Sequence, residues 1–291
     1  MTAQFTDAPA WRVTVQRLRN DRRSVLAAGA LLLMIVLVLV GPLVVADQPY
    51  EQLDITNLVH ARPGAKHLLG TDAFSRDVLS RVLSGGRVSL AVAMSAVCIE
   101  TLLGVSWGLA AGLAGGWIDT IMMRGVDAGL SVPRVLLLLA ILAAVPMVPV
   151  WALVLILGLT GWFGIARLVR NDVRSVRNAD FITAARSLGA SPPRLAFRHL
   201  LPQVSGSVLV AATLAVGQVI VLEAGLSFLG IGVQPPRASW GNIIGDGTDF
   251  IASAPWVSVA PGLCLVVVVL AVSALGDGLR DALAPRQLPS S

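Results

Sequence analysis

The stretch FITAARSLGASPPRLAFRHLLP, residues 181–202, lies between two long apolar runs, residues 150–166 and 204–222, and differs from both. It is basic, rich in alanine and glycine, and holds two adjacent prolines near its middle. Proline is tolerated in the first turn of a helix and glycine is favoured just past a helix end, so the pattern predicts two short helices around a turn. We therefore expect a polar helical hairpin inside a hydrophobic chain.

The first helix of this hairpin is predicted over residues 179–188. Asn178 or Asp180 can cap its N-terminus, because a short polar side chain accepts hydrogen bonds from the free amides there. Gly189 is expected to end it, because glycine adopts the left-handed conformation of a helix C-cap.

The second helix is expected to start at Ser191 as its cap, with Pro192 and Pro193 in the first turn, where a missing N–H costs nothing. Pro202 is expected to close this helix before the next apolar run.

The residue types on the hairpin favour a contact with another molecule. Ala184, Ala185 and Gly189 expose a nearly bare backbone beside Arg186, which lets another protein approach closely. The competing interpretation is an amphipathic helix on lipid headgroups, with Arg194 near the phosphates. The residues alone leave both open.

Composition identifies the kind of protein that carries this hairpin. The chain has 291 residues, of which 55% are hydrophobic and 13% charged, and its mean hydropathy is +0.78. Soluble domains carry about a quarter charged residues, so we expect a polytopic membrane protein. The net charge of +5 comes without a basic and aromatic surface pattern, so no nucleic-acid partner is expected. Cys98 and Cys264 lie in apolar runs and predict neither a disulfide nor a metal site.

Six apolar segments are long enough to cross a bilayer, and we expect an all-α protein with six transmembrane helices. They cover residues 25–46, 88–115, 129–148, 150–166, 204–222 and 257–276. The first could also be a cleaved signal, but it exceeds the roughly 7–15 apolar residues of such a segment, so we expect an uncleaved anchor.

Arginine placement predicts the orientation of these helices. Residues 1–24 hold five arginines and residues 167–202 hold seven, whereas residues 47–87 are balanced and residues 223–256 are acidic. Basic segments stay in the cytoplasm, so both termini and the hairpin are expected there. The predicted order is a cytoplasmic tail (1–24), the first helix (25–46), an extracytoplasmic segment with an amphipathic helix (47–87), a five-helix core (88–280), which contains an extracytoplasmic loop (223–256), and a cytoplasmic tail (281–291).

The order Ala184-Ala185, Gly189 and Leu201-Pro202 resembles the cytoplasmic EAA loop of ABC importer permeases. The resemblance implies that residues 171–202 form a coupling loop seated on an ATP-hydrolysing subunit. Thr183 stands where the family usually has glutamate. The implied contact residues are Asp180, Thr183, Ala184, Ala185, Arg186, Gly189, Ala190, Ser191 and Arg194.

Two further stretches are similar to the C-type permeases of dipeptide and oligopeptide importers: LGTDAFSRDVLSRVLSGGRVSL, residues 69–90, and GLSFLGIGVQPPRASWGNII, residues 225–244. Ser75 stands where relatives commonly have glycine. With the hairpin, the similarity covers about residues 65–285.

This resemblance implies a type I ABC importer permease in the cytoplasmic membrane of a prokaryote. The implied partners are a B-type permease in a heterodimer, one or two cytosolic ATP-binding subunits and an extracytoplasmic binding protein. Peptides are the expected solute, and nickel or another small solute is the alternative. ATP and magnesium belong to the partner ATPases, so no cofactor is expected on this chain.

No catalytic motif appears in the sequence. It lacks the P-loop, His-Glu-x-x-His and Gly-x-Ser-x-Gly patterns, and His60, His67 and His199 are scattered. We expect a non-catalytic subunit rather than an intramembrane hydrolase. A free-standing secondary transporter is the stronger rival, but it would have no need of a hairpin shaped for a partner.

Two carboxylates are candidates for the translocation pathway. Glu100 lies midway along the second apolar segment, where a charge is costly, so it either lines the pathway or ties two helices together. Glu223 lies near the outer end of the fifth, where a solvated or capping carboxylate is the alternative expectation.

The candidates for contact with a binding protein are Arg76, Asp77, Trp240 and Asn242. Thr71 or Asp72 would cap an amphipathic helix that carries Arg76 and Asp77 on the outer surface. The alternative for Trp240 is anchoring at the membrane interface.

On the inner side, Asp127, Ser131, Pro133 and Arg134 mark the entry into the third segment. We expect helix caps and snorkelling groups there, with a secondary ATPase contact as the alternative.

Overall fold

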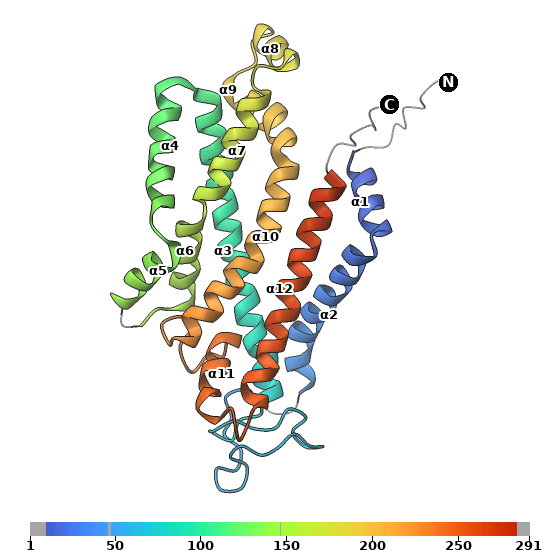
Figure 1. Cartoon of the computed structure of the whole chain (residues 1–291), viewed down its shortest axis with the longest axis vertical. Coiled ribbons are helices and arrows are strands. Elements are labelled where there is room, and N and C mark those ends of the chain that lie inside the picture. Colours follow the sequence, from blue (N-terminus) through green and yellow to red (C-terminus); the bar gives the residue numbers. More distant parts are fainter. Residues whose placement is uncertain (1–9, 46–47, 146, 284–291) are drawn as a thin grey trace.

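The computed structural model describes residues 10–45, 48–145 and 147–283. The expected tails at residues 1–24 and 281–291 and the end of the first apolar segment therefore lie partly outside the described residues. Long helices run side by side along the molecule, and short helices lie at both ends (Figure 1). The described residues contain no β-strand, and an isolated bridge joins Thr71 and Asp77. The all-α prediction is confirmed.

The helices are α1 Ala10–Asn20, α2 Arg22–Val44, α3 Val78–Ala114, α4 Gly116–Ser131, α5 Arg134–Ala143, α6 Val150–Gly161, α7 Phe163–Val176, α8 Asp180–Ser187, α9 Pro192–Arg194, the π-helix η1 Leu195–Leu200, α10 Leu201–Phe228, α11 Trp240–Asp246, the 3-10 helix η2 Thr248–Phe250 and α12 Trp256–Leu283. Among the described residues, five continuous helical segments are long and apolar enough to cross a membrane, and the bent pair α4–α5 makes up to six. Helices α1 and α8 and the end of α12 lie at one end of the bundle, and α11 lies at the other (Figure 1).

The second transmembrane helix begins earlier than predicted. Helix α3 is one continuous helix of 37 residues, capped by Asp77, whose Oδ2 accepts a hydrogen bond of 2.8 Å from the Ser80 amide. The prediction of a separate amphipathic helix within residues 47–87, capped by Thr71 or Asp72, is therefore wrong. Val78 and Val82 do pack against the bundle, as expected of that helix, but they belong to the first turns of α3 itself.

Ser75 shows why glycine suits its position. Its φ is 57°, in the left-handed region that glycine enters without steric cost. The buried Ser75 hydroxyl donates a 3.1 Å hydrogen bond to the carbonyl of Asp54, which holds the turn before α3.

The third and fourth apolar segments are divided. Helices α4 and α5 meet at 78°, and Pro133 lies at the break, because a residue before proline is disfavoured in the helical conformation. Helices α6 and α7 together cover residues 150–176 and form one candidate span.

The fifth transmembrane helix also starts early, because α9, η1 and α10 run on as one helical segment over residues 192–228. Pro202 does not close the second hairpin helix as predicted. The π-helical turn directly before it widens the backbone, which lets the chain stay helical past the proline ring.

Pro42 breaks the hydrogen-bond pattern inside α2, and a side chain of α3 replaces the missing donor. Pro42 has no N–H to offer the carbonyl of Val38, four residues earlier. Arg87 of α3 fills that place: its Nε donates to the Val38 carbonyl at 2.9 Å, and its Nη2 donates to the Leu39 carbonyl. In a membrane such a carbonyl needs a partner within the protein, so this contact ties α2 to α3.

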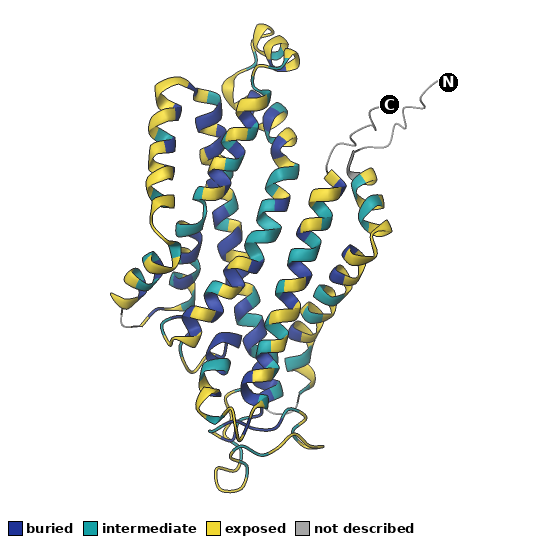
Figure 2. Ribbon diagram, in the orientation of Figure 1, coloured by how far each residue is buried: buried dark blue, intermediate teal, exposed yellow. Residues whose placement is uncertain are grey.

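Helices α3 and α7 approach each other across three glycines, Gly104, Gly108 and Gly112, which share one face of α3. A Cβ at Gly104 would lie 2.7 Å from the Cβ of Ile165, one at Gly108 2.6 Å from the Ala166 carbonyl, and one at Gly112 2.6 Å from Cγ1 of Val173. Small residues allow this close packing of membrane helices. Figure 2 shows buried residues along these inner faces, whereas the outer face of α2 is exposed.

The glycine contact predicts a difference between two alanine substitutions. Gly108→Ala forces a methyl group against the α7 backbone and is expected to destabilise the protein by about 1–3 kcal/mol. Gly125→Ala in α4 meets nothing within 4 Å and is expected to be neutral or stabilising. Thermal unfolding in detergent measures both. Equal midpoints for the two variants would contradict close packing of α3 on α7.

Candidate functional site

The hairpin projects beyond the bundle at the end where α1 also lies (Figure 1). Helix α8 ends in a turn in which the Gly189 amide donates to the Arg186 carbonyl at 2.9 Å and the Ala190 amide to the Ala185 carbonyl at 3.0 Å. Gly189 has a φ of +82° and no atom within 4 Å of where a Cβ would lie. Within this chain, glycine is therefore favoured at this position by its left-handed backbone conformation and not by close packing. The predicted stop at Gly189 is confirmed.

The predicted side-chain caps of the hairpin are wrong. The N-cap of α8 is Ala179, and no side chain caps that helix, although Asn178 and Asp180 lie beside it. Ser191 is the N-cap of α9 but makes no side-chain capping bond. Both residues before these helices are extended, so the backbone still turns into each helix.

The outer face of the hairpin carries most of the residues expected to contact an ATPase. Leu188 at its tip is 89% exposed, an apolar side chain with no neighbour to cover it in the described part of the chain. Ala185 and Ala190 are half-buried and pack inward, so they do not belong to this face. The exposed candidates are Asp180, Thr183, Ala184, Arg186, Gly189, Ser191 and Arg194.

The inner face of the hairpin is anchored in the membrane domain. Ile182 of α8 and Leu195 of η1 are buried in one apolar cluster with Leu109 of α3, Val173 of α7 and Val204 of α10. A force on the hairpin therefore acts directly on three long helices.

Ion pairs hold α4 and α7 together at the same end of the molecule. Arg170 donates to Asp119 through Nε at 2.9 Å and through Nη2 at 2.6 Å, a bidentate arrangement. Arg177 donates to the Gly112 carbonyl at 3.3 Å. Asp127, which was expected to mark a helix end, forms an exposed ion pair with Arg167 of α7, with 2.5 Å between Oδ1 and Nη2.

Glu100 forms an ion pair inside the membrane domain. Its residue surface is 2% exposed, and its Oε1 accepts a hydrogen bond from Nη2 of Arg134, which also donates to the Leu157 carbonyl at 2.7 Å. Arg134, the first residue of α5, was expected to be a snorkelling group. It points inward instead, because a buried carboxylate needs a cation or a hydrogen-bond donor. Gly161 makes room for the pair, since a Cβ there would overlap the Glu100 carboxylate.

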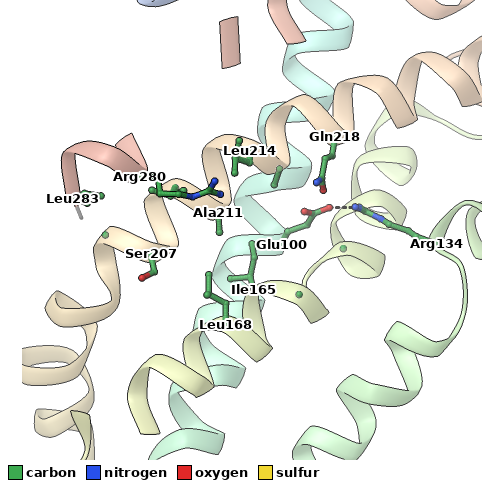
Figure 3. Close-up of a pocket in the computed structure, with 15 residues that line it drawn as sticks. Glu100, Arg134, Ile165, Leu168, Ser207, Ala211, Leu214, Gln218, Arg280 and Leu283 are labelled. Carbon is green, nitrogen blue, oxygen red and sulfur yellow. Dashed lines mark hydrogen bonds and ion pairs between the residues drawn. The ribbon is translucent and has the colours of Figure 1, made fainter. Parts of the chain in front are cut away.

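The pair lies in the wall of a cavity of about 580 Å³ (Figure 3). Helix α10 lines it with Ser207, Leu214 and Gln218, and Arg280 of α12 lies toward its other end. Sequence reasoning missed Arg134 and Gln218 as members of this site. An intramembrane glutamate does call for a basic partner, but the sequence does not show which of the arginines that flank apolar segments turns inward.

Glu223 lies outside this cavity and is fully buried. Its Oε1 accepts a 2.7 Å hydrogen bond from the Ser227 hydroxyl one turn later. The expectation of a solvated carboxylate at the end of the helix is wrong, because α10 continues to Phe228 and α11 packs closely beside this position, where a Cβ at Gly241 would overlap the Ala224 carbonyl.

Three of the four candidates for binding-protein contact are enclosed. Trp240 is fully buried, and its Nε1 donates to the Val82 carbonyl at 2.9 Å, so it does not anchor at a lipid interface. Asn242 completes a capping box with Ser239 at the start of α11. Asp77 caps α3. These side chains organise the outer loops, and a direct contact with another protein would need them to be exposed.

Arg76, the fourth candidate, belongs to a charge cluster that joins the two outer segments. Asp72 accepts from Arg76 Nε at 2.7 Å and from Arg81 Nη1 at 2.5 Å, and Arg81 also reaches Asp246 of α11 at 3.0 Å. Burial alone would raise the pKa of Asp72, but the Arg76 amide and the charges of Arg81 and Arg76 hold that pKa below its ordinary value.

Comparisons with known proteins agree with this geometry. Residues 104–288 match the family model described as binding-protein-dependent transport system inner membrane component. The chain is 42% identical over 241 residues to a putative peptide permease protein of Brucella suis, covering 82% of this chain and 80% of the relative. It is 34% identical to the oligopeptide transport system permease protein OppC of Bacillus subtilis (95% and 90% covered) and 36% identical to the dipeptide transport system permease protein DppC of Alkalihalophilus pseudofirmus (97% and 92%).

A solved structure of the MetNI methionine ABC transporter in an inward-facing conformation has a similar fold. The TM-score is 0.56, with 20% identity, and the match covers 70% of this chain and 96% of that one. At this identity the likeness establishes the permease fold.

The outer charge cluster predicts a pH-dependent stability. The pKa of Asp72 is lower in the folded protein than in the unfolded chain, where it is about 3.9. Ionised Asp72 therefore stabilises the folded protein fully above that unfolded value. This stabilisation is lost as the pH falls through the folded pKa. Asp72→Asn removes the buried carboxylate that Arg76 and Arg81 share and leaves Arg81 with its contact to Asp246, and the change is expected to cost about 3 kcal/mol at pH 7.

Thermal unfolding at pH 7 and at pH 3 measures this effect, with Asp249→Asn at an exposed position as the control. We expect the difference in unfolding midpoint between Asp72→Asn and the unmodified chain to be smaller at pH 3 than at pH 7. A difference that stays constant over this range would show that the charge of Asp72 contributes nothing.

Proposed function

This chain belongs to the family of binding-protein-dependent transport system inner membrane components, and we propose that it forms part of the membrane pathway of an ATP-driven importer of peptides. The names of its relatives support the solute class, since they are oligopeptide and dipeptide permeases. The observation that carries the proposal is the hairpin, exposed on its outer face and anchored in three membrane helices on its inner face.

The proposed assembly needs three kinds of partner. A second, B-type permease would complete the pathway, one or two cytosolic ATP-binding subunits would seat on the hairpin, and an extracytoplasmic binding protein would deliver the peptide. ATP and magnesium would be bound by the ATPase subunits. This chain would move its helices and make no covalent change in the solute.

The hairpin would act as a lever. Closure of the ATPase subunits would press on its outer face at Leu188 and Ala184, and the buried side chains of Ile182 and Leu195 would pass the movement to α3, α7 and α10. Interiors of proteins are close-packed, so a displaced side chain moves its neighbours rather than filling a void. Glutamate is usual at the position of Thr183, and here the exposed threonine would have to supply any contact at that point.

We assign the pathway to the cavity beside Glu100. Charged groups inside membrane domains lie in protein interiors or water-filled cavities and mark solute routes. Glu223 is buried away from this cavity, and we assign it to holding the outer end of α10 against the loop that follows. Among the residues near the outer surface, Arg76 retains partial exposure for a contact with the binding protein.

The lever predicts the effect of filling the exposed turn. Gly189→Val is expected to reduce ATPase activity stimulated by loaded binding protein by at least about tenfold, because losing a close-packed contact costs more than about 1.4 kcal/mol. Leu188→Asp, which leaves the left-handed glycine intact, is expected to have the same effect. ATPase assays of the purified complex measure both.

Gly116→Val is the matched control, since Gly116 also has a positive φ, of 56°, and nothing within 4 Å. It introduces similar backbone strain at the turn between α3 and α4, and it should leave stimulated ATPase activity near that of the unmodified complex. Normal stimulation in both hairpin variants would contradict the lever.

A further inference from the structure

Helix α10 presents a continuous strip of side chains to the cavity. Ser207, Ala211, Leu214 and Gln218 recur at intervals of three and four residues, so they lie on one helical face (Figure 3). Ser207 and Gln218 are eleven positions apart in the sequence, which corresponds to about 16 Å along the helix axis. An extended peptide rises about 3.3 Å per residue, so this strip matches about five residues of extended chain.

The polar end of the strip has hydrogen-bonding groups to spare. The side-chain amide of Gln218 is exposed and has no hydrogen-bond partner among the residues that the structure describes. Nε of Arg134 is buried and also lacks an acceptor there. Buried polar groups are nearly always paired, so the unpaired Nε of Arg134 indicates that an acceptor can be added at this end, and the accessible amide of Gln218 offers a second donor.

Arg134 is the charged group that faces the cavity at this end. Its side chain is 22% exposed, whereas the side chain of Glu100 is 2% exposed. The cavity therefore presents guanidinium and amide donors, and the carboxylate mainly keeps the arginine in place. Such a surface suits an anionic or carbonyl oxygen. It is poorly suited to a metal cation, because its single carboxylate is already paired with Arg134.

Pairing with Glu100 also sets how tightly a ligand is held. An unpaired arginine at this depth would bind a carboxylate strongly and retain it. An arginine that stays paired with Glu100 carries little net charge for a second carboxylate, so it binds that carboxylate more weakly and releases it. A pathway needs sites that are favourable enough to enter and weak enough to leave.

We propose that Arg134 and Gln218 form a transit site for the main chain of a peptide, in which Arg134 binds the C-terminal carboxylate and Gln218 donates to a peptide carbonyl. The apolar strip of α10 between Gln218 and Ser207 accommodates the remaining residues whatever their side chains, and peptides longer than about five residues extend past the strip. This inference rests on the proposed function and adds the chemical group that the pathway recognises.

The test uses the complete transporter reconstituted in proteoliposomes, with ATP inside and saturating peptide-loaded binding protein outside. The probes are an alanine-rich pentapeptide with a free C-terminal carboxylate and the same peptide as its C-terminal amide. Stimulated ATPase activity, recorded in the same vesicles, reports docking and coupling separately from uptake. Thr213→Ala on α10 is the control, since the Thr213 hydroxyl is bonded to the Leu209 carbonyl of its own helix.

We expect the unmodified transporter to favour the free acid by about tenfold in uptake per ATP, the ratio expected from one charge-assisted hydrogen bond. Arg134→Gln should abolish this preference while ATPase stimulation persists. Gln218→Leu should lower uptake of both peptides about tenfold and keep the preference, and Thr213→Ala should change neither.

A preference for the free acid that survives Arg134→Gln would overturn the proposal, as would uptake by Gln218→Leu equal to that of Thr213→Ala. If Arg134→Gln prevents assembly, Gln218→Leu decides, because it leaves the Glu100–Arg134 pair in place. A transporter that accumulates neither peptide before any substitution would contradict the proposed function itself rather than the transit site.

Discussion

The close contact of α3 with α7 across Gly104, Gly108 and Gly112 is the constraint on which the other features depend. Glu100 lies one turn before Gly104 on the same face of α3, so the contact also places its carboxylate against Gly161, in the space where Arg134 reaches it. At the other end, α7 leads into the hairpin (Figure 1). One helical face of α3 thus connects the intramembrane charge pair with the end of the molecule that carries the hairpin.

This arrangement provides a physical route for the proposed coupling between an ATPase and the membrane helices. The hairpin exposes small and polar residues together with Leu188 on its outer face, and its inner side chains Ile182 and Leu195 are packed among long helices. Helix α10 leaves the hairpin through a π-helical turn and then lines the cavity. A movement of the hairpin therefore reaches the wall of the cavity along a single continuous helical segment, without a flexible linker.

Local sequence signals predicted what local physics determines. The apolar runs and the glycine at position 189 were found because helix length, polarity and left-handed φ depend on nearby residues. The inward turn of Arg134, the burial of Glu223 and Trp240, and the helical passage of Pro202 were missed because each depends on a partner distant in the sequence or on an altered helical turn. A charged residue at the edge of an apolar run looks the same whether it turns toward water or toward a buried carboxylate.

The proposed role of this chain is to conduct peptides as part of an ATP-driven assembly. The most direct test is to co-express the chain with its genomic neighbours, purify the complex in mild detergent, reconstitute it and follow radiolabelled peptide entering vesicles. The account predicts co-purification of a second permease and an ATPase, and accumulation that requires both ATP and loaded binding protein. A chain that purifies alone and moves peptide down its gradient or with an ion gradient, independently of ATP, would contradict it.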